Sequence, residues 1–319
     1  MAVSGEKELA EEHGVFGRLS LIDFVDAENL YKTFIIPSSN QRMPTLPPEL
    51  EREIFELALN SSNSRATCAG NTEYLTLKFA LRRVCRRVEY WVDLVSYRSI
   101  AVETSTDSGD FLELLARKPP GFFSEKVKDF WIGHFVPNAH AIDLLSACNA
   151  VEQLACYVDH KPTPKLPELI RRLPLTRLWI EHVHFSDVAS LQSPTFFPAL
   201  THLYLIFWER RPPIDVPLLI QKLPLLHNLT HLALACNPTN PRLAQTVCAA
   251  LPDLLFLVIS LDCELEESDK TYAFDPRVVT VYVDYDEEEQ DIGDSNRIWV
   301  YAEEAVAQRR SKSATSGAS

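Results

Sequence analysis

Residues 200–207 read Leu-Thr-His-Leu-Tyr-Leu-Ile-Phe, and this stretch recurs along the chain. Residues 229–234 repeat it as Leu-Thr-His-Leu-Ala-Leu, and residues 175–180 repeat it as Leu-Thr-Arg-Leu-Trp-Ile. Weaker copies begin at Val127, Val151, Leu251 and Asp275. The fold is therefore expected to be built from similar units placed one after another.

The spacing of the copies indicates the kind of unit. Taking the fourth residue of each copy as a marker, successive differences are 24, 24, 25, 29, 22 and 24 residues, for the markers Phe130, Leu154, Leu178, Leu203, Leu232, Leu254 and Val278. A period in the twenties with an L-x-x-L-x-L core is typical of leucine-rich repeats, with one short strand and one helix per unit. Such a unit cannot cover its own apolar face, so the units must stack. The pattern predicts an α/β solenoid with a parallel sheet on the concave side and helices outside.

Apolar helical segments lie between the predicted strands. Prolines follow most of these segments and end each helix before the next strand. Strand and helix in regular alternation predict a parallel sheet. The expected helices span residues 111–117, 141–146, 167–173, 217–223 and 242–251, and residues 98–102 are expected to form the first strand.

Alternation along each strand predicts which side chains point inward. The fourth and sixth residues of each copy should be buried, as in the pairs Leu154/Cys156, Leu178/Ile180, Leu203/Leu205 and Leu232/Leu234. The third and fifth residues should then line the concave face. In the last copy the register stays open, because Val279, Val281 and Val283 could equally form the inward set.

Several large side chains fall at the outward positions and resemble a hot spot for protein binding, in which aromatic and arginine side chains dominate. The alternative is that the N-terminal leader or the C-terminal segment covers these rings, or that they pack on one another. The predicted target-binding residues are Trp131, Arg177, Trp179, His202, Tyr204 and His231.

The chain ahead of the repeats is expected to hold a separate helical part. Prolines at positions 47 and 48 suit a helix start, and the apolar residues that follow recur at helical spacing up to position 58. A second helical run is expected over residues 74–94. The predicted organisation is a weakly ordered leader (1–44), a helical module (45–98), a repeat solenoid with a C-terminal cap (99–306) and a disordered tail (307–319).

The helical module resembles an F-box of the fungal F-box-like type. The resemblance rests on Leu-Pro-Pro-Glu-Leu at 46–50, Ile-Phe at 54–55, Leu-Arg-Arg-Val-Cys-Arg-Arg-Val at 81–88, and Trp91 and Tyr97-Arg98. It implies docking on a Skp1-like adaptor of a cullin-RING ubiquitin ligase, while the repeats hold a target protein. The adaptor-binding residues that it implies are Leu46, Pro47, Leu50, Ile54, Val84, Cys85 and Val88. The alternative is a leucine-rich-repeat scaffold without a ubiquitin role, whose helices close the end of the solenoid.

The amino-acid composition excludes some classes of binding partner. The formal net charge is −13, which argues against nucleic-acid or anionic-membrane binding, because both need a basic surface. The sequence holds no apolar run long enough for a membrane helix and no signal-peptide pattern at its start. Its 7 cysteines are scattered without a C-x-x-C pair, which favours the reducing cytoplasm or nucleus. Nothing in the sequence indicates a homo-oligomer.

No set of catalytic or cofactor-binding residues is predicted. The serine-hydrolase, phosphate-loop and zinc-protease motifs are missing from the sequence. His182 and His184 are separated by one residue, but such a pair without a third ligand is more often incidental. The acidic stretch 284–294 lacks the glycine of a calcium loop. We therefore expect no enzyme, no metal and no cofactor.

Overall fold

The chain divides into two compact units, one ending at Ser96 and the other beginning at Tyr97. The computed structural model describes residues 47–63, 72–159, 164–190, 197–207, 216–235, 241–261, 274–282 and 297–316. The leader expected over residues 1–44 and the acidic stretch 284–294 lie outside the described residues. Each unit is treated by itself below.

The first unit contains three described helices around a small apolar core of its own. The helices are α2 (Pro48–Asn63), α3 (Thr72–Arg82) and α4 (Arg86–Ser96). Helices α2 and α4 contribute the buried side chains, and Phe55, Leu81, Leu94 and Val95 pack around them. The fully buried members are Leu59, Val88, Trp91 and Val92.

The helical run predicted over residues 74–94 is divided by a turn. The N–H groups of Arg83 and Val84 donate to carbonyls three residues earlier, at 3.2 and 3.0 Å, and this tightened turn ends α3. Arg82, the last residue of α3, places Nε 3.4 Å from the buried carboxylate of Asp93 on α4. The two shorter helices can therefore pack on each other, which one straight helix could not do.

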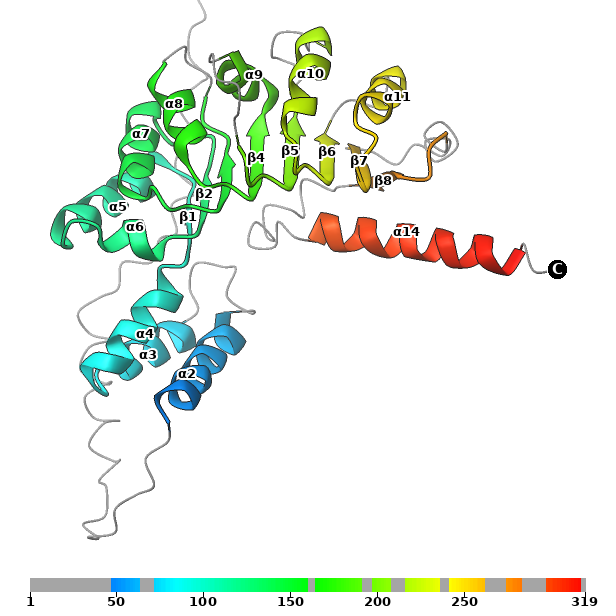
Figure 1. The fold of residues 1–319 in the computed structure, drawn as a ribbon. Coiled ribbons are helices and arrows are strands. Elements are labelled where there is room, and N and C mark those ends of the chain that lie inside the picture. The colour runs from blue at the N-terminus through cyan, green and yellow to red at the C-terminus, as the bar shows by residue number, and fades with distance from the viewer. Residues whose placement is uncertain are drawn as a thin grey trace, which may run out of the picture. The chain divides into compact units, whose positions relative to one another are not determined.

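The second unit is built on an eight-stranded sheet whose strands are all parallel and follow one another in chain order (Figure 1). This confirms the predicted α/β class and the parallel sheet, and it is consistent with a solenoid. The strands are β1 (Ser99–Val102), β2 (Asp129–Ile132), β3 (Gln153–Cys156), β4 (Arg177–Glu181), β5 (His202–Ile206), β6 (His231–Ala235), β7 (Phe256–Leu261) and β8 (Val278–Tyr282).

A helix or helical turn follows most strands and covers one face of the sheet (Figure 1). The five predicted helices are confirmed within a few residues, apart from α5, which begins earlier. Two more helices were not predicted: α6 is short, and α9 begins directly after β4 without a turn signal. The elements are α5 (Ser105–Arg117), α6 (Phe122–Lys126), α7 (Asn138–Ala147), α8 (Lys165–Arg172), α9 (His182–Ser190), α10 (Val216–Lys222), η1 (Leu223–Leu225) and α11 (Pro241–Ala250).

The earlier start of α5 has a local cause. The Thr104 hydroxyl accepts from Asp107 N–H at 3.1 Å, and the Asp107 carboxylate accepts from Thr104 N–H at 3.0 Å. This reciprocal pair is a capping box, which satisfies two donors that would otherwise lack a partner at the helix start.

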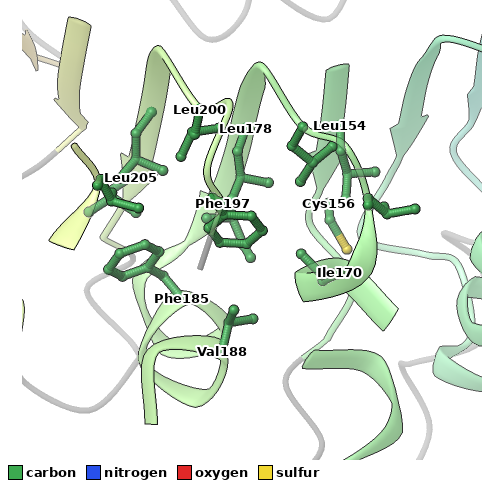
Figure 2. Packing of buried hydrophobic residues seen from close by; sticks show 14 of the residues in the cluster. Leu154, Cys156, Ile170, Leu178, Phe185, Val188, Phe197, Leu200 and Leu205 are labelled. Atoms are coloured by element: carbon green, nitrogen blue, oxygen red, sulfur yellow. The ribbon is translucent and has the colours of Figure 1, made fainter. Parts of the chain in front are cut away.

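The repeated leucines lie side by side in neighbouring strands. Leu154, Leu178, Leu203 and Leu232 are paired in register and are at most 1% exposed. The side chains of Leu154 and Leu178 lie on the same side of the sheet as residues of the helices and turns, such as Ile170, Phe185 and Phe197 (Figure 2). The predicted inward pairs are therefore confirmed, and they belong to one continuous core.

The register predicted for the sixth copy is wrong. Leu232 pairs with Leu257 rather than with Leu254, so the outward residues in that unit are Phe256 and Val258. Leu254 is also buried, but it lies in the turn before β7. Because the sequence offers apolar residues at both positions, spacing alone could not choose between them. In the last copy, Val278 joins the main core and Val279 lies on the opposite face.

Threonines at the second position of three copies link consecutive units. The Thr201 hydroxyl donates to the Thr176 carbonyl at 3.1 Å, and the Thr230 hydroxyl donates to the Thr201 carbonyl at 3.3 Å. The Thr176 hydroxyl does the same to the Glu152 carbonyl at 3.1 Å. These bonds add to the backbone ladder immediately before each strand and hold the strand starts in register.

The last unit is tied to α11 by one arginine. Arg277 donates to the carbonyls of Cys248 at 3.0 Å and Leu251 at 2.9 Å, at the end of α11. A guanidinium there satisfies carbonyls that have no partner within the helix and complements the helix dipole. Asp275 holds the guanidinium from the other side at 2.8 Å, and this hydrogen-bonded pairing lowers the pKa of Asp275.

Helix α14 (Arg297–Ser316) packs on the sheet face opposite the other helices of this unit (Figure 1). The predicted C-terminal cap, which was expected to end at residue 306, corresponds to its first half. The helix continues to Ser316, where a disordered tail was expected from residue 307. The sequence Ala-Gln-Arg-Arg at 307–310 consists of good helix formers, which explains the continuation.

Replacing one of the aligned leucines should destabilise the whole repeat unit. Leu178→Ala removes a side chain that is 1% exposed, and such a change typically costs about 2–5 kcal/mol of unfolding free energy. Leu255→Ala is the matched control, because Leu255 is 48% exposed. Urea unfolding measures both. A Leu178→Ala effect no larger than that of the control would contradict the described core.

Candidate protein-interaction surfaces

Helix α2 carries apolar side chains on two of its faces. Phe55 and Leu59 face the core of the first unit. Leu50, Ile54 and Leu57 are 48, 51 and 63% exposed, and their spacing of four and three residues places them on one face of the helix. We call these three residues the α2 strip. An apolar strip that its own unit does not cover marks an interaction site more often than a random surface does.

The other residues predicted to bind an adaptor have different outcomes. Pro47, Val84 and Cys85 are exposed, whereas Leu46 lies outside the described residues. Val88 is 0% exposed and belongs to the core of the unit, so its placement on a binding surface is wrong. Helix α4 turns Val88 inward together with Trp91 and Val92, at the i, i+3 and i+4 spacing of one helical face.

Two exposed aromatic residues on the same unit were not predicted. Phe79 on α3 is 45% exposed and Tyr90 on α4 is 52% exposed. The signal for Phe79 was present in the sequence, since it lies two residues from both Leu77 and Leu81, whose spacing of four residues puts them on one helical face. A residue two positions away on a helix points to the opposite side.

In the second unit, the outward residues of the strands form one continuous row. Trp131, Ala155, Trp179 and Tyr204 are paired in register on β2 to β5, and the row continues through Ala233, Val258 and Val279 on β6 to β8. We call this row, with the third-position residues beside it, the aromatic face. The prediction that Trp131, Trp179 and Tyr204 share one face of the sheet is confirmed, whereas Val258 and Val279 were not predicted there.

The aromatic face is covered by α14. Trp299, Ala302 and Val306 of that helix are at most 3% exposed and cluster with the row. Trp179 and Tyr204 are only 5 and 7% exposed. The expectation that these two rings face solvent is therefore wrong, and both belong to one buried cluster with residues of the C-terminal helix α14. The physical reason is the large apolar area of the row, which is stabilised by removal from water.

Two stacked histidines lie under α14. The rings of His202 and His231 are 4.1 Å apart at an interplanar angle of 12°. Trp299 meets both rings edge-on, with centroid distances of 5.2 and 5.8 Å, and Glu303 places a carboxylate oxygen 3.5 Å from His231 Nε2. The two histidines are therefore a main contact between the sheet and the helix.

Hydrogen bonds to the preceding threonines fix the orientation of both histidine rings. Nδ1 of His202 and of His231 lies 2.8 Å from the hydroxyl of the preceding threonine. Each hydroxyl also lies within hydrogen-bond distance of a backbone carbonyl of the preceding unit, at 3.1 Å for Thr201 and 3.3 Å for Thr230. Burial, helped by His231 and Arg177, lowers the pKa of His202 to about 3. Burial also lowers the pKa of His231, against the opposing effect of Glu303.

The start of the aromatic face is less covered. Trp131 is half-buried and packs edge-on against Tyr157 at 4.8 Å, and Arg177 is half-buried. After β2, His134 is exposed and Phe135 is 78% exposed. Neither residue was predicted to bind a target. Both follow a strand directly, where a loop residue of a repeat unit has access to solvent.

The polar groups near the strand ends have structural roles. His184 donates from Nε2 to the Val158 carbonyl at 2.8 Å, and His182 Nδ1 lies 3.4 Å from the Ile206 carbonyl. Both rings therefore join neighbouring units. Burial raises the pKa of the Cys148 and Cys156 thiols to about 12, so both pack as neutral groups. Across the described ranges, no three His, Cys, Asp or Glu residues are grouped so as to hold a metal.

Comparison with known proteins gives no relationship. No protein-family model matches the chain, and no curated protein matches it. None of the described helices is long and apolar enough to cross a membrane.

The buried histidines predict a pH dependence of stability. Because the pKa of His202 is lowered in the folded chain, the unfolded chain binds a proton first as the pH falls below about 6.5. Stability should therefore fall between pH 6.5 and 5. His231 and Arg177 act on the His202 ring in the same direction as burial, and Glu303 acts on the neighbouring His231 ring. Urea unfolding across this pH window should show a smaller slope for His202→Gln than for wild type.

The matched control is His227→Gln, since His227 is exposed. Its slope should equal that of wild type. An unchanged slope in His202→Gln would show that the buried ring does not carry the dependence.

Proposed function

We propose that this protein is a substrate-recruiting subunit of a ubiquitin ligase of the Skp1–cullin–F-box type. The first unit is an F-box-like module that binds a Skp1-like adaptor, and the second is a leucine-rich-repeat solenoid that binds a target protein. The exposed α2 strip on a unit with its own core is the single observation that carries this proposal.

The α2 strip is poorly explained by stability of the first unit alone. Full burial of a Leu or Ile side chain contributes roughly 1.5–3 kcal/mol, and the unit leaves about half or more of each of these three side chains exposed. A partner that covers them gains this free energy on binding. The helix-in-groove mode of recognition uses anchors at i, i+4 and i+7, which is the spacing of Leu50, Ile54 and Leu57.

Charged pairs on the same unit suit the polar rim of an interface. Arg52 pairs with Glu56 along α2, and Arg87 of α4 pairs with Glu51. Arg87 also lies over the ring of Trp91, 5.3 Å from the centroid. Protein interfaces combine an apolar centre with a polar rim, so these ion pairs support recognition at the edge of the α2 strip.

The second unit supports the recruiting role through its repeated surface. Parallel strands with leucines in register bury one side of the sheet and leave the other to side chains that can differ from unit to unit. Trp131, Phe135 and His134 are the accessible members near the second strand. We assign them to the target-binding surface, together with the predicted residue Arg177.

The adaptor interaction can be tested with purified proteins. Leu50→Asp and Ile54→Asp each place a charge in the α2 strip, and each should weaken adaptor binding by at least 2 kcal/mol, about thirtyfold or more in Kd. Both side chains are exposed, so the fold should tolerate the change. Isothermal titration calorimetry against a Skp1-like adaptor measures the effect.

Thr76→Asp is the matched control, because Thr76 is an exposed residue of α3 outside the strip. It should bind like wild type. Equal adaptor affinity in all four proteins would remove the strip from the interface. If none of the four proteins bound the adaptor, a leucine-rich-repeat scaffold without a ubiquitin role would describe the protein better.

A further inference from the structure

Helix α14 is attached to the aromatic face by a short set of side chains. Its buried residues Trp299, Ala302 and Val306 follow the i, i+3 and i+7 spacing, and Glu303 adds a charged contact to His231 at 3.5 Å. This is the pattern by which an amphipathic helix binds a protein groove. Its opposite side is solvent-facing, with Val300 and Tyr301 52 and 55% exposed.

The helix crosses several strands instead of extending the sheet. Trp299 contacts the histidines of β5 and β6, and Arg309 donates from Nη1 to the Val278 carbonyl of β8 at 2.6 Å. The main core on the other side of the sheet contains no residue of α14. The sheet and its covering helices therefore do not depend on α14 for their own core.

The contact between α14 and the sheet is also imperfect. Within the described part of the chain, the buried indole N–H of Trp299 has no hydrogen-bond acceptor, and His231 Nε2 makes no hydrogen bond. Buried polar groups without partners weaken a contact. A helix that offers an acceptor, or a purely apolar ring, at these points would fit the same surface better.

From this geometry we propose that the aromatic face is a receptor for an amphipathic helix, and that α14 is a resident occupant which the helix of a target protein replaces. The fitting helix carries an aromatic residue at i, a small residue at i+3, an acidic residue at i+4 and a β-branched residue at i+7. The claim that this helix belongs to a target protein rests on the proposed recruiting function. The claim that the aromatic face binds an amphipathic helix does not.

Because α14 belongs to the same chain, it competes strongly with any separate helix for the aromatic face. Residues 283–296 connect β8 to α14, and two groups joined by a short segment meet at an effective concentration on the order of millimolar. A separate copy of the same helix must compete against that concentration, whatever its intrinsic affinity. The closed chain should therefore bind such a helix with an apparent Kd near the millimolar range, and an opened chain should bind it much more tightly.

The test uses the full chain and a labelled peptide of residues 297–316. Trp299→Ala removes the main anchor of α14 in cis and leaves the sheet unchanged. Fluorescence anisotropy should show that this variant binds the peptide at least about tenfold more tightly than wild type does, because the competitor is weakened. Hydrogen exchange of the α14 amides should become faster in the same variant.

Tyr301→Ala is the matched control, since it removes an exposed ring from the same helix. It should leave peptide affinity and α14 exchange at wild-type values. A peptide carrying Trp299→Ala should bind poorly to the opened chain. Ala302→Glu is a second opening variant, which inserts a carboxylate where the helix meets the sheet, and circular dichroism checks that the chain stays folded.

Equal, weak peptide binding by wild type and by both opening variants would overturn the proposal, and so would equally fast α14 exchange in wild type and in the opening variants. These outcomes do not involve the adaptor. Loss of adaptor binding in the α2 strip variants therefore tests the recruiting function separately from the receptor property of the aromatic face.

Discussion

A strand–helix unit of this length cannot bury its own apolar side chains, and the second unit of the protein is organised by that constraint. Leu178 is covered only because Leu154 and Leu203 lie beside it in register and because helices cover the row from one side. Any shift between strands would separate the leucines from each other. The hydroxyls of Thr176, Thr201 and Thr230 oppose such a shift, because each bonds a carbonyl of the preceding unit.

The alternation along each strand that points the leucines to one side of the sheet points the aromatic face to the other side. Residues of α14 cluster with that second row. Trp179 and Tyr204 lie on the opposite side of the strands from the leucines. Large rings in a continuous row would present a wide apolar surface to water. The alanines Ala155 and Ala233 are the small members of the row, and Trp299 and Ala302 of α14 belong to the same buried cluster. In the proposed receptor role, cover from within the chain and binding of a partner are two uses of one surface.

Helix α2 also carries a second set of apolar side chains on a face that does not join the core of its unit. Phe55 and Leu59 stabilise its unit, whereas Leu50, Ile54 and Leu57 do not. A helix with a single apolar stripe would need no partner beyond its own unit. The second stripe supports the proposed recognition role, and the ion pair of Arg87 with Glu51 holds α2 and α4 in the arrangement that presents it.

The period, the parallel sheet and the inward leucines could be predicted from the sequence, because they follow from a spacing that the units share. The sequence did not determine the register of the sixth unit, where Leu254 and Leu257 both fit an apolar position. Only the tertiary structure decided which apolar side chains stay exposed. Val88 proved to be core, and Trp179 was found in one buried cluster with residues of α14, a helix more than a hundred residues later in the chain. Burial depends on which segments meet across such distances, and local spacing does not contain that information.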